Sequence, residues 1–300
     1  MQMLEAKWAK GKFVCVGLDP VLEKLPKSVT IPTHLRSRDI DERTATIAAF
    51  NIAIVDMTRD LVCAYKPNAA FYEAYGAAGL EALAWTLHHI RQYAPDVPVI
   101  YDAKRADIGN TNAGYAKSAF DDLQADAITV HPYLGAEAMQ PFLDRADKGV
   151  IVLCRTSNKG AKELQDLELH LSQGLREMIG GRRDREIIDT LPLYQYVAHS
   201  VATRWNANGN CAVVVGATYP SELAEVRRIV GDMPILIPGI GAQGGDLEAA
   251  VKAGRDTRGR GMIINSSRGI LYASSGEDFA EAARRETRKL HDQITACLKA

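Results

Sequence analysis

The sequence has no surplus of either charge. Lys and Arg total 36 and Asp and Glu total 37, which leaves a formal net charge of -1 at pH 7. A chain so nearly neutral carries no global positive field that would attract nucleic acid or an anionic membrane. Neither is therefore expected as a partner, and an anionic ligand would have to be bound by a local site.

Long hydrophobic runs are also missing. Apolar stretches such as AVVV and PILI are far shorter than the ~20 residues that a membrane span needs. The opening MQMLEAKWAKGK lacks the apolar core of a signal peptide. Together these two absences make a cytoplasmic enzyme the expectation.

Cysteine is scarce and scattered. The five cysteines stand at positions 15, 63, 154, 211 and 297, and no two of them form a CxxC pair. This pattern favours neither a disulfide framework nor a zinc site, and no metal is expected. Four of the cysteines lie within apolar runs, so we expect them to be buried as small hydrophobic side chains.

Short apolar runs are what the sequence has in abundance. The chain has 300 residues, 47% hydrophobic and 24% charged, which is the composition of an ordinary globular protein. Runs rich in Val and Ile alternate with stretches of helical composition. The runs cover residues 13–19, 62–68, 98–104, 127–132, 149–157, 212–218, 234–239 and 261–267. The helical stretches include residues 44–61, 77–94, 112–124, 220–230 and 245–254.

Eight strand–helix units in a chain of this length fit a barrel better than a doubly wound sheet. We therefore predict an α/β fold: a single (β/α)8 TIM barrel over residues 1–300, with its active site at the C-terminal ends of the strands. The longest connection, at about 157–211, holds helix-like segments at 169–179 and 193–205. The charged run at 180–189 is expected to be a solvated loop or helix end, with a mobile lid as the alternative.

Polar side chains stand at the end of nearly every apolar run. In a barrel, the carboxyl ends of the strands meet at one mouth, so these side chains should form a polar pocket there. They are Asp19, Lys66 with Asn68, Asp102 with Lys104, His131, Thr156 with Ser157, and Thr218.

The stretch YDAKRADIGNT at 101–111 concentrates charge directly after an apolar run. Charges at such a place are costly to desolvate unless they pair or perform chemistry. Because strand side chains alternate, Asp102 and Lys104 should project to the same face. Asp107 lies past the strand, before a helix that we expect to be capped near residues 110–111. Spacing alone leaves open an ion-pair network that only braces the barrel rim.

Lys66 ends its run in YKPN, where Pro67 disfavours further pairing in a central ladder. One interpretation is a Schiff-base lysine, as in an aldolase, and another is a charge partner for Asp102 and Lys104. A Schiff-base amine must be neutral to attack, which nearby carboxylates oppose, so they favour a lysine that stays protonated. A rim lysine without a catalytic role is the third interpretation.

The glycine-rich turn PGIGAQGG at 238–245 follows the seventh run, and Arg268 follows the eighth. Glycines let backbone N–H groups approach an anion closely. A phosphate site built by the loops after strands 7 and 8 recurs in this fold. We therefore predict a phosphate site here, with a plain strand-to-helix turn as the alternative.

Several motifs together resemble the orotidine 5'-phosphate decarboxylase family, specifically its longer bacterial subgroup (type 2). The stretch DAKRADIGNT fits the family signature D-x-K-x-x-D-I-x-x-T. The other landmarks are VGLDP (16–20), AYKPNAAFYEAYG (64–76), VGAT (215–218), and PGIGAQGG with NSSRGI (265–270). The resemblance implies a TIM barrel that converts orotidine 5'-phosphate to uridine 5'-phosphate in de novo pyrimidine biosynthesis, without a cofactor.

The resemblance also implies roles for individual residues. Lys66, Asp102, Lys104 and Asp107 would form a charged array at the carboxylate that is lost. Lys104 would protonate C6, while Asp102 would crowd the leaving group and help to hold Lys104. Family members are typically homodimers, in which the counterparts of Asp107 and Thr111 reach into the partner's site. The implied substrate-binding residues are Asp19, Ile108, Thr111, Gly241, Gln243 and Arg268.

Among these, Asp19 and Lys66 would contact the ribose, and Gln243 and Arg268 would hold the phosphate with backbone N–H groups near Gly241. In many shorter family members a serine recognises the base. The corresponding segment here is TVHPYLG (129–135), which contains His131, and the resemblance assigns the role to no particular residue of it.

Other functions remain open at this point. An aldolase or other sugar-phosphate lyase would use Lys66 or Lys104 covalently. A metal-dependent barrel enzyme would need more acidic or His ligands at the strand ends than the sequence provides. A barrel that only binds a phosphorylated ligand is the non-catalytic alternative.

Overall fold

A computed structural model describes residues 1–180, 189–240 and 246–299. Its centre is an eight-stranded parallel sheet in the order β2-β1-β10-β9-β8-β5-β4-β3. Isolated bridges from Tyr65 to Val99 and from Asn68 to Asp102 bring the two edge strands together, so the sheet is nearly closed. The strands are β1 (Val14–Gly17), β2 (Val62–Lys66), β3 (Ile100–Arg105), β4 (Ala127–Val130), β5 (Gly149–Arg155), β8 (Cys211–Val215), β9 (Ile235–Pro238) and β10 (Met262–Ser266). The predicted (β/α)8 barrel and all eight predicted strands are confirmed.

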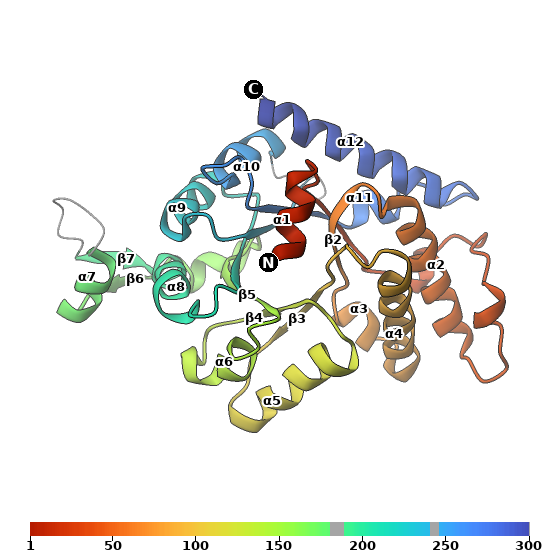
Figure 1. The fold of residues 1–300 in the computed structure, drawn as a ribbon, viewed down its shortest axis with the longest axis horizontal. Coiled ribbons are helices and arrows are strands. Elements are labelled where there is room, and N and C mark those ends of the chain that lie inside the picture. Colours follow the sequence, from red (N-terminus) through yellow and green to blue (C-terminus); the bar gives the residue numbers. More distant parts are fainter. Residues whose placement is uncertain (181–188, 241–245, 300) are drawn as a thin grey trace.

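Helices surround the barrel (Figure 1). The longer ones are α2 (Glu42–Thr58), α4 (Gly76–Tyr93), α5 (Gly109–Lys117), α6 (Gly135–Leu143), α8 (Leu193–Ser200), α9 (Pro220–Val230), α10 (Leu247–Gly254) and α12 (Phe279–Lys299). Short helices are α3 (Ala70–Glu73) and α11 (Arg268–Leu271), and π-helical turns follow α5 at Ser118–Asp122 and α8 at Val201–Trp205. Turns of 3-10 helix lie at Leu22–Lys24, Thr33–Leu35 and Lys159–Glu163. The five predicted helical stretches are confirmed, with shifted ends in all but the stretch at 220–230.

The largest shift is at α5. Its cap was expected near residues 110–111, but the helix begins at Gly109 and its N-cap is Ile108, which makes no side-chain cap hydrogen bond. Gly109 has φ +48°, a conformation that glycine adopts at little cost. The helix therefore begins sooner after Asp107 than a polar N-cap at residues 110–111 would allow.

The strands are apolar because helices cover their outer faces while side chains fill the barrel. Every residue of β1, β2, β4 and β8 is buried. A parallel sheet covered on both faces needs this continuous apolar character, and each fully buried Val or Ile contributes about 1.5–3 kcal/mol. Cys15, Cys63, Cys154 and Cys211 lie in this core, as predicted, whereas Cys297 is partly exposed.

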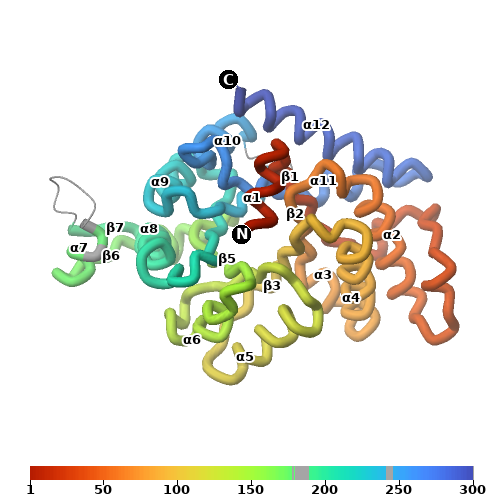
Figure 2. The backbone as a smooth tube through the Cα atoms, viewed as in Figure 1, coloured from red at the N-terminus to blue at the C-terminus, as the bar shows by residue number. Residues whose placement is uncertain are grey.

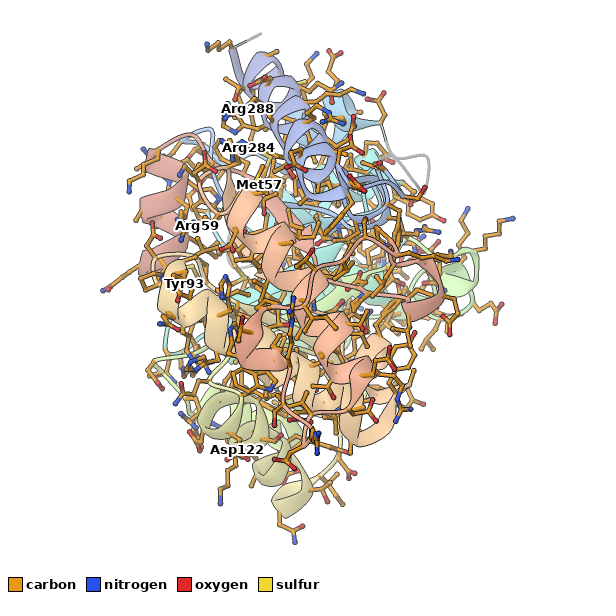
Figure 3. All side chains as sticks on the ribbon, turned by 90° about the vertical axis from the view of Figure 1, so that its right-hand side faces the viewer. Met57, Arg59, Tyr93, Asp122, Arg284 and Arg288 are labelled. Carbon is orange, nitrogen blue, oxygen red and sulfur yellow. The ribbon has the colours of Figure 1, made fainter. Side chains whose placement is uncertain are left out.

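Charged side chains tie the outer helices to one another at the surface. In Figure 3, Arg284 of α12 lies close to Met57 of α2, and its guanidinium donates to the Met57 carbonyl. Arg59, just after α2, donates to the carbonyl of Tyr93, the last residue of α4. These bonds hold the shell of helices in place around the strands.

The amino-terminal helix α1 (Gln2–Ala9) lies across the barrel rather than beside it, as the tube in Figure 2 shows. Trp8 is buried and donates through its indole N–H to the carbonyl of Met262, the first residue of β10. Lys7 is 2% exposed and pairs with Asp96 at 2.7 Å. The end of the barrel where the strands begin is therefore covered, and the end where they finish is left for a site.

The long connection between β5 and β8 carries elements of its own, which project from the side of the barrel (Figure 1). Strand β6 (Glu168–His170) pairs antiparallel with β7 (Thr190–Pro192), and α7 (Gln173–Gly180) follows β6. The helix predicted at 169–179 therefore begins later than expected, because its first residues belong to β6. Leu171, Ile179 and Leu191 form a small separate core.

Most of the charged run at 180–189 lies outside the described residues. The assignment of residues 1–300 to one domain stays a prediction. Within the described ranges, no helix is long and apolar enough to cross a membrane.

Candidate active site

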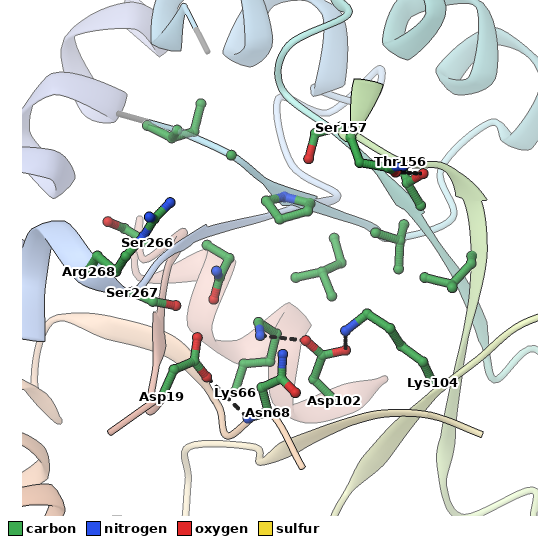
Figure 4. A pocket seen from close by; sticks show the side chains of 18 of the residues that line it. Asp19, Lys66, Asn68, Asp102, Lys104, Thr156, Ser157, Ser266, Ser267 and Arg268 are labelled. Atoms are coloured by element: carbon green, nitrogen blue, oxygen red, sulfur yellow. Dashed lines mark hydrogen bonds and ion pairs between the residues drawn. The ribbon is translucent and has the colours of Figure 1, made fainter. Parts of the chain in front are cut away.

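The C-terminal ends of the strands surround a cavity of about 640 Å³ (Figure 4). This volume falls in the range typical of small-molecule sites. The strand-end residues predicted to form a pocket are largely brought together here. The charged and amide side chains that line it include Asp19, Lys66, Asn68, Asp102, Lys104, Gln165 and Arg268.

Asp102 occupies the centre of the charged wall. The residue is 7% exposed, and its carboxylate accepts from Lys66 Nζ at 2.7 Å on Oδ2 and from Lys104 Nζ at 2.7 Å on Oδ1. Figure 4 shows the two ammonium groups on either side of the carboxylate. The charges at the end of β3 thus pair with one another and with a lysine from β2. This pairing offsets the cost of desolvating them.

Asp102 and Lys104 meet as expected, but not through the regular alternation that motivated the expectation. Strand β3 loses its register with β4 between Tyr101 and Arg105. Lys104 itself has φ +48°, in the left-handed region that residues other than glycine rarely adopt. A local bulge therefore sets the direction of Lys104, and bulges of this kind often re-aim a side chain next to a site.

The electrostatics of the buried pair keep both groups charged. Burial alone would raise the pKa of Asp102, but the positive charges of Lys66 and Lys104 outweigh it, and the pKa lies well below its usual value. Burial alone would lower the pKa of Lys66, but Asp19 and Asp102 outweigh it, and the pKa lies above its usual value. Lys66 is therefore held as an ammonium, which opposes its use as a Schiff-base nucleophile.

Asp19 stands beside this cluster, just after β1. Its Oδ1 accepts the backbone N–H of Asn68 at 3.1 Å, which links the ends of β1 and β2. The Tyr272 hydroxyl donates to the Asp19 carbonyl at 3.1 Å. The carboxylate thus lines the pocket in a fixed position and can accept from a ligand hydroxyl.

Arg268 borders the pocket on the side of β10, and it is exposed. It lines the cavity, and no ion pair among the described residues involves it. Nearby, a Cβ on Gly17 would stand 1.8 Å from the Ser267 hydroxyl oxygen, so only glycine lets these segments approach so closely. Gly241 and Gln243, the other predicted phosphate contacts, lie outside the described residues.

Three predicted site residues lie away from the cavity of their own chain. Asp107, Ile108 and Thr111 are not among the residues that line it. The Ile108 side chain is 59% exposed and Thr111 is exposed, while Asp107 accepts the Ile108 N–H at 2.7 Å. Arg105, the fourth charge of the motif, pairs with Glu73 and lies over the Tyr115 ring.

The wall opposite the charged cluster is neutral. Thr156, Ser157 and Asn158 follow β5 and line the pocket together with Gln165 from the long connection. Gln165 accepts the Thr156 N–H at 2.8 Å and donates to the Thr156 hydroxyl at 2.8 Å. Sequence reasoning marked Thr156 and Ser157 as strand-end residues but missed Gln165, because nothing in its neighbourhood indicates that the connection folds back over the barrel.

Two further residues contrast with the sequence-based expectations. His131 lines a second cavity and not the one that holds the charged cluster. Thr129 was missed: its hydroxyl donates to Asp102 Oδ1 at 2.9 Å, although it stands inside the apolar run 127–132. Thr129 could have been identified from the sequence only because it is a polar residue within an apolar run. Among the described residues, no group of three His, Cys, Asp or Glu could hold a metal ion.

The geometry defines a class: a (β/α)8-barrel protein whose strand ends form an enzyme-like pocket with a buried carboxylate between two ammonium groups. The sequence matches the model of the Orotidine 5'-phosphate decarboxylase / HUMPS family over residues 12–285. The chain belongs to this family.

Individual relatives agree with this assignment. The chain is 47% identical to an orotidine 5'-phosphate decarboxylase from Janthinobacterium sp. (strain Marseille), covering 98% of this chain and 97% of the relative. It is 49% identical to one from Ralstonia pickettii (strain 12J), with the same two coverages of 98% and 97%.

Solved structures agree as well. The structure of Leishmania donovani OMP decarboxylase superposes with a TM-score of 0.77 at 37% identity, covering 100% of this chain and 98% of that one. Leishmania donovani UMP synthase superposes with a TM-score of 0.79 at 37% identity. That match covers 99% of this chain and 56% of the synthase chain.

Proposed function

We propose that the charged pocket decarboxylates orotidine 5'-phosphate to uridine 5'-phosphate, with Lys104 protonating C6 of the pyrimidine. The chain is a carboxy-lyase of pyrimidine biosynthesis, in line with its family and with relatives that carry this name along nearly their whole length. The observation that carries the assignment of residues is the Lys66–Asp102–Lys104 array at the barrel mouth, in which Lys66 and Asp102 are buried.

The chemistry explains why such an array is useful. Loss of CO₂ from C6 leaves an electron pair on a vinylic carbon that has no electron sink, so up to ~20 kcal/mol of differential stabilisation is needed. An ammonium group held where this charge develops stabilises the transition state and then supplies the proton. Lys104 fits both roles, because its ammonium is fixed by Asp102 and its side chain is 45% exposed to the pocket. The proposed reaction uses no cofactor.

Asp102 and Lys66 support Lys104 rather than react themselves. Asp102 stays ionised, so it holds the Lys104 ammonium in place and presents a negative charge beside the carboxylate to be lost. Lys66 balances that charge from the other side at 2.7 Å. Without Lys66, a buried carboxylate would depend on one partly exposed ammonium group.

The rest of the nucleotide can be placed along the pocket. Asp19 and Lys66 would contact the ribose hydroxyls, and Arg268 would hold the phosphate together with Gly241 and Gln243. Arg268 lies at the pocket edge and has no ion-pair partner among the described residues, which supports the phosphate role, since arginine binds phosphate in a bidentate manner. Binding energy from these remote groups serves to orient the reacting carbon against Lys104.

A homodimer with shared active sites is part of the proposal. Asp107, Ile108 and Thr111 belong to the family motif, yet they do not line the cavity of their own chain. The exposed Ile108 (59%), Tyr133 (76%) and Leu134 (46%) provide the apolar surface that a subunit interface requires. In a dimer, Asp107 and Thr111 would complete the partner's site. A cytoplasmic location also belongs to the proposal, and the buried free thiols suit a reducing compartment.

The activity is tested by mixing the purified protein with orotidine 5'-phosphate and EDTA and following the loss of the orotate chromophore. We expect turnover that EDTA does not reduce. An inactive protein would contradict the proposal. Loss of activity in EDTA would point to a metal-dependent enzyme, and trapping of the protein by borohydride with substrate would point to a Schiff-base lyase.

The shared site is tested by mixing inactive subunits. Lys104→Ala and Asp107→Ala subunits, each inactive alone, should recover activity when mixed, because each heterodimer that forms contains one intact site. Mixtures that stay inactive while forming heterodimers would show that Asp107 acts within its own chain.

A further inference from the structure

Thr129 holds an unusual position beneath the charged wall. It lies in β4, is 1% exposed and does not line the cavity. Its hydroxyl donates to Asp102 Oδ1 at 2.9 Å and accepts the backbone N–H of Lys104 at 2.9 Å. An amide can only donate and a carboxylate can only accept, so the direction of both bonds is settled. One buried hydroxyl therefore contacts both members of the Asp102–Lys104 pair.

The register of the sheet explains why this hydroxyl is needed. Tyr101 pairs with Ile128 and Arg105 pairs with Val130, so residues 102–104 of β3 stand opposite the single residue Thr129 of β4. In such a bulge the ladder is interrupted, and a backbone N–H loses its usual carbonyl partner. The Thr129 side chain takes the place of that carbonyl for the Lys104 N–H.

The same bond stabilises the conformation of Lys104. A lysine with φ +48° persists only where its surroundings compensate for the strain. The bond from the Lys104 N–H to Thr129 provides part of that compensation, and Pro67 accepts the Asp102 N–H at 2.9 Å on the other edge of β3. The direction in which the Lys104 side chain leaves the backbone thus depends on Thr129.

We propose that Thr129 is a positioning residue: its hydroxyl sets the bulge of β3 and the orientation of the Asp102 carboxylate, and thereby aims the Lys104 ammonium at the reacting carbon. The effect on catalysis rests on the proposed function. The effect of the Thr129 hydroxyl on the β3 bulge and on the Asp102 carboxylate does not depend on it. Thr129 does not touch the substrate. Asp102 keeps both lysine partners without it, so the charges survive its removal while their geometry loosens.

The test compares Thr129→Val, which keeps the shape and removes the hydroxyl, with Thr129→Ser, which keeps the hydroxyl. For Thr129→Val we expect kcat to fall by ~100-fold, since misplacement of a catalytic group by about 1 Å has an effect of this order. KM should change little, because the ribose and phosphate contacts are untouched. Thr129→Ser should restore most of kcat.

Thr287→Val is the matched control. Thr287 is 0% exposed and its hydroxyl donates to the Ala283 carbonyl within α12, far from the strand ends in sequence. Its loss should lower the melting temperature about as much as Thr129→Val does, with kcat unchanged. A purely structural role for Thr129 would give the two variants the same kinetics. If Thr129→Val does not fold, Thr129→Ala carries the same comparison.

A second readout does not need activity. Hydrogen exchange of the Lys104 amide should speed up in Thr129→Val and stay slow in Thr129→Ser. Unchanged exchange of the Lys104 amide in Thr129→Val would overturn the inference. So would a folded Thr129→Val whose kcat lies within 3-fold of the parent enzyme, because the loss of one weak hydrogen bond anywhere in the protein could have an effect of that size. Failure of serine to restore kcat would overturn it as well. Faster exchange in a protein that never turns over orotidine 5'-phosphate would instead refute the proposed function alone.

Discussion

The two walls of the pocket are built in different ways. The charged wall joins Lys66, Asp102 and Lys104 through ion pairs of 2.7 Å at the ends of adjacent strands. The neutral wall is held by amide and hydroxyl bonds between Thr156, at the end of β5, and Gln165 of the long connection.

An ion pair between the buried Arg155 and the partly exposed Asp166 anchors the neutral wall from behind. Arg155 is 0% exposed and its Nε lies 3.1 Å from Asp166 Oδ1. Its guanidinium also stacks over the Tyr219 ring at 4.3 Å. A Cβ on Gly216 would lie 2.9 Å from the Ser157 backbone N, so glycine lets β8 approach this wall closely. The charge here stays behind the wall and does not face the cavity.

The difference indicates a division of labour. A fixed charge next to the reacting carbon acts mainly on the transition state, whereas a neutral wall shapes the space that the substrate occupies in both states. Changes to the charged wall should therefore lower kcat. Changes to the neutral wall should act more on KM.

Lys104→Ala should have the largest effect. In the proposed mechanism it removes both the charge at the developing carbanion and the proton donor, so we expect kcat to fall by ~10⁴-fold or more. Nucleotide binding should be largely retained, as measured by titration with uridine 5'-phosphate. Lys252→Ala is the control, because Lys252 is an exposed lysine that pairs only with Glu248 among the described residues. A Lys104→Ala variant that keeps a substantial kcat would contradict the idea that the charged wall acts on kcat and the neutral wall on KM.

Asp102→Asn should impair both stability and activity. It leaves the buried Lys66 ammonium without its main ion-pair partner, which costs about 3–5 kcal/mol in the free energy of unfolding. Urea denaturation measures the loss in the free energy of unfolding, and assays of orotidine 5'-phosphate turnover measure the accompanying fall in kcat.

The pH dependence of that loss has a definite sign. The pKa of Asp102 is depressed in the folded state, so its contribution is complete above the unfolded-state value of about 4 and disappears as the pH falls further. The stability difference between the parent enzyme and Asp102→Asn should be constant from neutral pH down to about pH 5 and shrink below about pH 4. A difference that grows in acid would contradict the ion pair.

Gln165→Leu should have a moderate effect, and on KM more than on kcat. It removes the two 2.8 Å hydrogen bonds between the Gln165 side chain and Thr156, each worth about 0.5–1.5 kcal/mol, so we expect KM to rise by ~10-fold with a smaller change in kcat. Gln140→Leu is the matched control, because Gln140 is exposed and bonds only to Asp144 among the described residues. A fall confined to kcat would place Gln165 with the chemistry instead.

The smallest effect concerns two buried thiols, Cys15 of β1 and Cys154 of β5. Burial raises the pKa of both Cys15 and Cys154 to about 12, so neither should react with iodoacetamide at neutral pH in the intact protein. In Gln165→Leu, Cys154 should become labelled faster than Cys15, because the neutral wall alone is loosened. Mass spectrometry of the labelled peptides checks this. Equal labelling would mean that the walls open together.

Much of the fold was predictable because it depends on local patterns. The apolar runs at 13–19 and 212–218 become β1 and β8, since a strand covered on both faces needs continuous apolar character. The helix predicted at 220–230 has those bounds in the structure. Strand ends of a parallel barrel meet at one mouth, so Asp19, Lys66 and Asp102 could be placed at a single pocket without coordinates.

The sequence by itself determined the barrel, the mouth at which the polar residues gather, and the presence of Asp102 and Lys104 at that mouth. Those features follow from the periodicity of the apolar runs and from the points at which the runs end. Only the tertiary structure decided that Lys104 leaves β3 through a left-handed bulge, that the Thr129 hydroxyl fills the gap in the ladder, and that Gln165 folds back onto Thr156. These contacts depend on the register between strands and on the path of a long connection, and neither is encoded in the local pattern of the residues concerned.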